Sequence, residues 1–275
     1  MTLSTIRNNP AKQKKVKTKK QKAIAATCAV AFWLLVWHVV SLCIGSELVL
    51  VSPVKVVQTL FTVIFDPDFL KTVWYSAARI LGGFFTALTL GTVLGWVASR
   101  FWVVETLLRP ITAVIKATPV ASFIILVLLW FSGKNLSVII SMLMVFPVIY
   151  MNVLEGIRSA DEKLLEMAQV FRLSVGKKLL YIYLPAVAPF FVSACSVSLG
   201  LCWKSGIAAE VIGTPDGSIG AVLYQAKIFL QTSELLAWTV VVVAVSVAFE
   251  KLFMFLLRLV LKKLKMEDVL NGKRA

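Results

Sequence analysis

Two ionisable residues and a tryptophan lie close together in an apolar stretch near position 205. Trp203, Lys204 and Glu210 follow a long run of apolar and small residues. Charged side chains at membrane depth are costly unless they are paired or face water. Lys204 and Glu210 are six residues apart and lie on different faces of a continuous helix, but Gly206 and Gly213 favour a break. The two charges are therefore either an interfacial pair or part of a polar path or its outer gate.

A second candidate site is the polar segment 159–185, SADEKLLEMAQVFRLSVGKKLLYIYLP. Ser159 or Asp161 can cap a helix start, with acidic residues in the first turn. Apolar residues then recur at helical spacing and predict one apolar face on a short helix. These residues are Leu164, Leu165, Ala168 and Phe171.

The helical pattern breaks around Arg172 to Ser174 and resumes in a second amphipathic piece, 175–183. Pro185 is then expected to open the next long helix, where its missing N–H costs nothing. Two short helices joined by a bend thus present an apolar face beside charges. Such a face suits docking into a groove on a partner protein, although a plain loop on lipid headgroups remains the alternative.

The sequence lacks the common catalytic and metal-binding motifs. It has no Gly-x-x-x-x-Gly-Lys-Ser/Thr phosphate loop, no His-Glu-x-x-His and no nucleophile elbow. The four cysteines lie in apolar segments without a Cys-x-x-Cys pair, which indicates packing residues and neither metal ligands nor disulfides. We therefore predict that the chain is not an enzyme and holds no cofactor or metal of its own.

The composition requires a lipid environment. Of the 275 residues, 59% are hydrophobic and 16% are charged, and the mean hydropathy is +0.86. Soluble domains have about 45–50% hydrophobic and about 25% charged residues. Runs of about 20 apolar residues recur, each long enough to cross a bilayer. We predict an all-α integral membrane protein with six spans. These are 23–45, 77–99, 111–132, 136–156, 186–203 and 233–260.

The third predicted span is interrupted near its start by Pro110, Lys116 and Pro119. The first is longer than the apolar region of a signal peptide and is expected to stay uncleaved. The predicted organisation is a basic tail, a six-span domain with its loop, and a second basic tail. Their bounds are 1–22, 23–260 with the loop 159–185, and 261–275.

Basic residues set the predicted orientation. Eight of the 29 Lys and Arg residues precede the first apolar run without interleaved aromatic residues, a pattern that favours a topology signal and contact with anionic lipid over nucleic-acid binding. With the N-terminus in the cytoplasm, 23 of the 29 lie inside. This excess predicts an even number of spans with both termini cytoplasmic.

The second predicted span carries a stripe of small residues at a spacing of four: Gly83, Ala87, Gly91, Gly95 and Ser99. One helix face of this kind lets another backbone approach closely. The stripe packs either within the same chain or at a subunit-dimer seam. On the outer side, 54–65 and 219–230 predict short helices, with a turn at 214–217.

Several of these residues together resemble a known family. Part of segment 159–185 is similar to the Glu-Ala-Ala loop of binding-protein-dependent ABC importer permeases. The similar positions are Glu166-Met167-Ala168, then Ser174, then Leu184-Pro185. Met167 replaces the usual Ala and Arg172 the usual Gly, and a left-handed bend without Gly costs about 1 kcal/mol or more.

The resemblance covers roughly residues 47–260. Four stretches resemble the nitrate/sulfonate/taurine branch of these permeases. In chain order they are SPVKVVQTL, SAARILGGFFTALTLGTVLG, RPITAVIKATPVASFIILVLLWFSG and WKSGIAAEVIG. The resemblance implies a type I importer permease fold in the plasma membrane and a homodimer. It also implies an extracytoplasmic substrate-binding protein and cytosolic ATPase subunits that bind ATP and Mg. Segment 159–185 would form the coupling helices, and the transported substrate would be a small organic anion or a related nutrient.

An ATP-independent secondary transporter or channel is the alternative. It would need coupling-ion or pore residues of its own, but buried acids are scarce in the predicted spans and no inverted repeat is evident. A membrane-embedded enzyme is a weaker third interpretation, because no catalytic cluster lies near either predicted surface.

Overall fold

The computed structural model describes residues 19–264, and every regular element among them is helical. The predicted tails 1–22 and 261–275 therefore lie largely outside the described residues. The helices are α1 (Lys19–Ile44), α2 (Pro53–Ile64), α3 (Phe69–Arg100), α4 (Trp102–Ala117), α5 (Val120–Leu128), α6 (Gly133–Arg158), α7 (Glu162–Val170), α8 (Val175–Lys178), α9 (Leu184–Gly213), α10 (Ile219–Ile228) and α11 (Thr232–Lys263). A π-helical turn, Leu179–Tyr183, joins α8 to α9.

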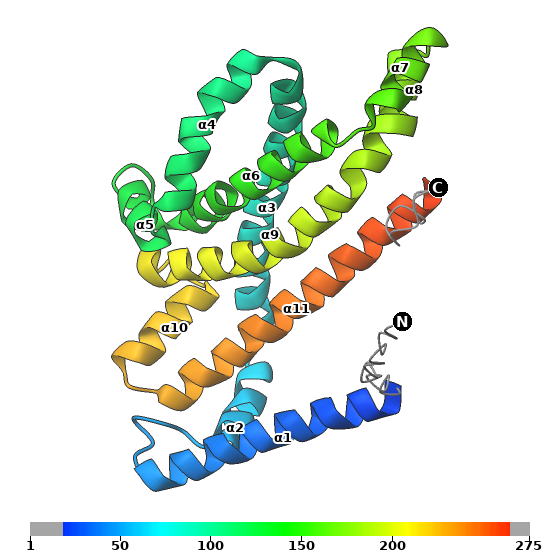
Figure 1. Cartoon of the computed structure of the whole chain (residues 1–275). Coiled ribbons are helices and arrows are strands. Elements are labelled where there is room, and N and C mark those ends of the chain that lie inside the picture. The colour runs from blue at the N-terminus through cyan, green and yellow to red at the C-terminus, as the bar shows by residue number, and fades with distance from the viewer. Residues whose placement is uncertain (1–18, 265–275) are drawn as a thin grey trace, which may run out of the picture. The chain divides into compact units, whose positions relative to one another are not determined.

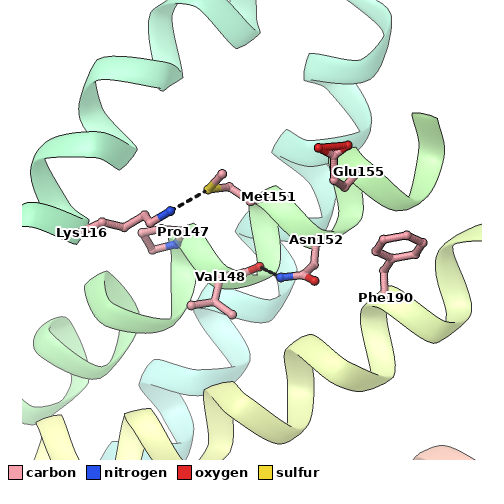
Figure 2. A pocket seen from close by; sticks show the side chains of 7 residues that line it. All are labelled: Lys116, Pro147, Val148, Met151, Asn152, Glu155 and Phe190. Atoms are coloured by element: carbon pink, nitrogen blue, oxygen red, sulfur yellow. Dashed lines mark hydrogen bonds between the residues drawn. The ribbon is translucent and has the colours of Figure 1, made fainter. Parts of the chain in front are cut away.

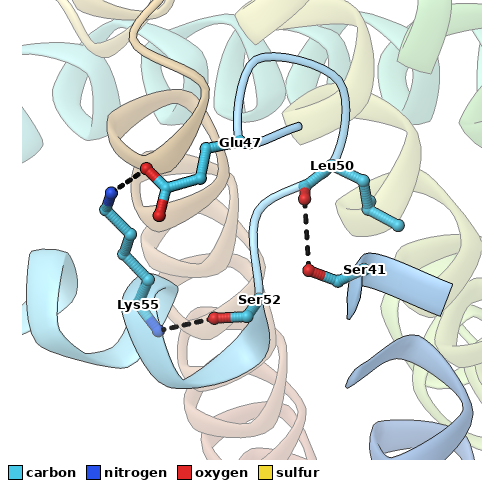
Figure 3. A network of polar contacts seen from close by, with 5 residues as sticks. All are labelled: Ser41, Glu47, Leu50, Ser52 and Lys55. Carbon is cyan, nitrogen blue, oxygen red and sulfur yellow. Dashed lines mark hydrogen bonds and ion pairs between the residues drawn. The ribbon is translucent and has the colours of Figure 1, made fainter. Parts of the chain in front are cut away.

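The chain divides into two compact units between Lys55 and Val56. In the first unit, the loop after α1 folds back on that helix, where the Ser41 hydroxyl donates to the Leu50 carbonyl at 3.2 Å (Figure 3). The Trp37 indole N–H donates to the Val51 carbonyl at 3.1 Å, and an ion pair joins Lys55 to Glu47. These contacts fix the path of the chain from α1 into the start of α2.

The second unit is built around α3, α6 and α9, with α10 and α11 packed on α9 (Figure 1). Its core is apolar and includes Phe84 from α3, Ile149 from α6 and Leu199 from α9, each at most 1% exposed. Four members of the small-residue stripe, Gly83, Ala87, Gly91 and Gly95, are buried, whereas Ser99 is only partly buried. The buried part of the stripe faces α6 of the same chain, which is the first of the two packing arrangements expected for it.

Glycine is required at three stripe positions because the helix backbones are in contact there. A Cβ at Gly83 would collide with the Val138 carbonyl, and one at Gly91 or Gly95 would press on Ile149 or Val153 at 3.0 Å. Ala87 is fully buried in the same row. Gly82, one residue away, has open space where its Cβ would stand.

Five described helices are long and apolar enough to span a membrane, and a bent pair makes a sixth if it counts as one span. That pair corrects the predicted third span, 111–132, which is not one helix. The structure has α4 and α5 at an angle of 106°. Thr118 and Pro119 are extended between them, as expected because a residue before proline avoids the helical region.

The fifth predicted span, 186–203, is also too short. Helix α9 runs on through Gly206 to Gly213, so the break expected there is wrong. Gly206 serves packing instead, because a Cβ would collide with Ile80 of α3 and the Ser141 hydroxyl of α6. The helix ends where Thr214 adopts the left-handed conformation, with φ of 41°. The expected outer helices are present as α2 and α10.

Candidate functional site

The predicted coupling loop forms a bent helical segment, 159–183, called the elbow below. Helix α7 begins after Asp161, whose carboxylate accepts a hydrogen bond from the Lys163 N–H at 2.9 Å. Asp161 is therefore the cap, whereas Ser159 closes the C-terminal end of α6. Glu162 in the first turn faces the positive end of the helix dipole.

The bend of the elbow is a Schellman motif with arginine in the glycine position. Arg172 has a φ of 51°, in the left-handed region. The Arg172 N–H donates to the Gln169 carbonyl at 3.0 Å, and the Leu173 N–H donates to the Ala168 carbonyl at 2.9 Å. The left-handed bend is thus present even though Arg172 stands where the resembled family usually has Gly.

The elbow has one buried and one exposed side. Ala168 is fully buried against Ala160 and Ile182, with Leu165 packed on the same cluster. Ala168 is therefore a packing residue of the elbow, and a larger side chain there would disturb the elbow itself.

The exposed side of α7 is apolar. Met167 is 47% exposed, Val170 79% and Phe171 72%, with Leu164 beside them and Glu166 also exposed. Leu164, Leu165, Ala168 and Phe171 were expected to form a single apolar face. This prediction is wrong for two of the four. Leu164 and Phe171 point away from the buried cluster.

The second half of the elbow runs without a break into α9. Ser174 precedes α8, and the chain stays helical from Val175 to Gly213. Helix α9 begins at Leu184 with Pro185 in its first turn, as predicted, and it continues α8 without an intervening loop. The π-helical turn accommodates the proline, and the Leu184 N–H donates to the Leu179 carbonyl five residues back.

An ion pair joins the start of α4 to the elbow end of α6. The Arg158 guanidinium at the end of α6 contacts the Glu105 carboxylate in the first turn of α4. The α3–α4 turn and the elbow, both predicted cytoplasmic, thus lie at the same end of this unit (Figure 1). The starts of α3 and α6 lie at the opposite end together with α10.

A cavity of about 340 Å³ opens between α4, α6 and α9 (Figure 2). Lys116 is the one cation among its lining residues, and its ammonium contacts the Met151 sulfur at 3.4 Å. Asn152 and Glu155 also line it. Met151 lies seven residues before Arg158, about 10 Å from the elbow end of α6. Lys116 itself is exposed, in the last turn of α4.

The opposite end holds a buried carboxylate. Glu210 of α9 is fully buried, and its Oε2 accepts hydrogen bonds from the Ser76 hydroxyl of α3 at 2.7 Å and the Gly220 N–H of α10 at 3.3 Å. The Ser76 oxygen in turn accepts from the Ile219 N–H at 2.9 Å. Glu210 is therefore not an interfacial residue that extends to water. It connects α9 to α3 and α10.

The start of α10 provides hydrogen-bond partners around this buried carboxyl group, whose other oxygen, Oε1, has no hydrogen-bond partner within the described chain. Its first three N–H groups, on Ile219, Gly220 and Ala221, donate to Ser76, Glu210 and the Ser218 cap. Each N–H group of the first turn is thus paired, and the Glu210 carboxyl group lies at the positive end of the helix dipole. Gly220 is needed because a Cβ would collide with Glu210.

The structure separates the other two residues of the predicted gate from Glu210. Trp203 is buried in the core between helices, and Lys204 is exposed on another face of α9. Ser76 and Gly220 were not predicted, and a serine 134 positions before its partner gives no local signal. Among residues 19–264, no group of three His, Cys, Asp or Glu side chains is placed to hold a metal ion.

Comparison with known proteins places these features in a family. Residues 87–266 match the family described as binding-protein-dependent transport system inner membrane component. The chain is 29% identical over 214 residues to the aliphatic sulfonates transport permease protein SsuC of Bacillus subtilis (strain 168), covering 77% of each chain.

Two further relatives are similar over comparable lengths. The taurine transport system permease protein TauC of Escherichia coli (strain K12) is 27% identical over 220 residues, which is 78% of this chain and 80% of TauC. The nitrate import permease protein NrtB of Synechocystis sp. is 25% identical over 250 residues, or 87% and 90%. The chain is a multi-pass membrane protein that belongs to the family of binding-protein-dependent transport system inner membrane components.

Proposed function

We propose that the chain is the membrane-spanning subunit of an ATP-driven importer, coupled through the elbow to a cytosolic ATPase. It works as a homodimer that receives substrate from an extracytoplasmic binding protein. ATP and Mg are bound by the ATPase, whose motion at the elbow exposes the substrate path alternately to each side.

The exposed apolar side of the elbow carries this proposal. Met167, Val170 and Phe171 are clustered on a short helix at the predicted cytoplasmic end, although nothing within the described chain covers them. An exposed apolar patch rimmed by charges is characteristic of a protein-docking surface, and a helix laid in a groove is a common recognition mode. The Schellman bend fixes the angle at which this patch is presented.

We propose a small organic anion or a related nutrient as the substrate class. Lys116 is the one cation that lines the cavity between α4, α6 and α9, where its ammonium can attract an anion, and Glu155 lines the same cavity. The relatives are named for sulfonate, taurine and nitrate transport, and each of these compounds carries an anionic group. Glu210, with Trp203 and Lys204 nearby in sequence, is assigned to the outer gate, where it ties α9 to α3 and α10.

The test is co-purification of the chain with its ATPase after charge is placed on the exposed side of the elbow. Met167→Asp and Phe171→Asp should abolish the complex while membrane insertion and thermal stability are retained. Val103→Asp is the matched control, because Val103 is an exposed apolar residue near the start of α4, outside the elbow. An intact, ATP-hydrolysing complex in both elbow variants would refute docking at this site.

Transport in vesicles separates the importer from the alternative. The importer requires the ATPase and ATP for uptake of an anion. Uptake driven by an ion gradient alone, in vesicles that contain only this chain, would show an ATP-independent transporter or channel instead.

A further inference from the structure

A second cavity lies where α3 ends beside the elbow, with a volume of about 390 Å³. Arg100, the last residue of α3, and Lys178, the last residue of α8, both line it. Ser99 adds a hydroxyl, and no acidic residue is among the lining residues. Within the described chain neither cation is in an ion pair. Two unneutralised cations facing one cavity indicate an anionic ligand.

The remaining lining residues indicate where that ligand lies relative to the membrane. Trp96 and Tyr183 pack edge to face, with ring centroids 5.9 Å apart. Both aromatic types are enriched where a bilayer meets water, and Arg100 marks the end of a membrane span. Ile157 and Val175 supply apolar surface beside the charges. A ligand with an anionic head and an apolar body fits this combination.

We propose that this cavity binds the phosphate headgroup of an anionic phospholipid from the cytoplasmic leaflet. The phosphate is held by Arg100 and Lys178, and the glycerol and upper acyl chain lie along Trp96, Ile157 and Tyr183. One lipid thereby connects the end of α3 to α8, so that it stabilises the elbow from the membrane side. The site does not require an ATPase or a transported substrate.

The cytoplasmic leaflet contains anionic lipid and attracts basic groups near its surface, by about 1 kcal/mol for each Lys or Arg. The same phosphate chemistry could come from inorganic phosphate, but the aromatic and apolar lining favours a lipid. The exposed apolar side of α7 is a separate surface, made of residues that do not line this cavity.

Binding of phosphatidylglycerol to the purified full-length chain tests the proposal, measured by native mass spectrometry against phosphatidylcholine. Arg100→Gln and Lys178→Gln should each weaken phosphatidylglycerol binding about fivefold, in line with one lost cation near the surface. Lys177→Gln removes the same charge from the neighbouring exposed position, and Arg109→Gln removes one from an exposed position in the middle of α4; neither residue lines the cavity. These two controls should bind as the unmodified chain does.

Four results would overturn the proposal. Equal loss in Lys177→Gln and Lys178→Gln would show diffuse surface charge, and equal binding of phosphatidylcholine would show no headgroup selectivity. Displacement of the lipid by millimolar inorganic phosphate would assign the site to the free ion. Displacement by added ATPase subunits would assign the cavity to the protein interface.

Discussion

The Ser76 hydroxyl and the Glu210 carboxylate, 134 residues apart, form a hydrogen bond of 2.7 Å in the buried space between α3 and α9. The serine also accepts the Ile219 N–H, and the carboxylate also accepts the Gly220 N–H. The two side chains therefore satisfy the first two N–H groups of α10, and the Ser218 cap satisfies the third. Removing either one leaves buried polar groups without partners.

Ser76→Ala should lower the free energy of unfolding by about 1–3 kcal/mol. The buried Ile219 N–H loses its acceptor, and the Glu210 carboxyl group loses one of its hydrogen bonds. Glu210→Ala should cost more than Glu210→Gln, whose amide oxygen still accepts hydrogen bonds. The thermal midpoint of the detergent-purified protein measures both effects. Ser205→Ala is the control, since this buried hydroxyl donates only to carbonyls of its own helix, and it should shift the midpoint little.

Gly82 and Gly83 should respond to alanine with opposite signs. Gly83→Ala places a Cβ within 2.8 Å of the Ser141 Cβ and against the Val138 carbonyl, so α3 and α6 must separate at a cost of about 1–3 kcal/mol. Gly82→Ala meets open space and gains about 1 kcal/mol of helix propensity. Thermal midpoints of the two variants test this. Equal shifts would show that the α3–α6 contact is looser than the structure has it.

Arg172→Gly should stabilise the elbow by about 0.5–1 kcal/mol, because glycine adopts a φ of 51° without the strain of a Cβ. Arg172→Val should destabilise it further, since β-branched residues fit this region poorly. Hydrogen exchange of the Leu173 amide, which closes the motif on the Ala168 carbonyl, reports the local opening. Faster exchange in the glycine variant would contradict the assigned strain.

The Glu105–Arg158 ion pair should contribute little stability alone. Its side chains are 26% and 49% exposed, and pairs of this kind contribute about 0.2–1 kcal/mol. A double-mutant cycle with Glu105→Gln and Arg158→Gln should give a coupling energy in that range, decreasing at high salt. Coupling unchanged by salt would show that the pair is shielded from solvent.

The sequence alone established the membrane class, the family and the approximate position of five long helices. Long apolar runs and the basic residues between them are local signals, because each residue reports its own preference for lipid or water. The α10 start after the 214–217 turn was predicted for the same reason, as was a helix start at either Ser159 or Asp161, of which the structure has Asp161. Capping and turn preferences depend on near neighbours.

Tertiary packing decided the rest. Gly206 suggests a helix break in isolation, but its lack of a Cβ is used for contact with Ile80 and Ser141 from two other helices. Leu164 and Ala168 both fit one apolar face by spacing, yet only Ala168 finds neighbours to bury it. Glu210 has hydrogen-bond partners in the interior because Ser76 and the start of α10 meet it there. Each outcome depends on groups distant in the chain, which no local pattern encodes.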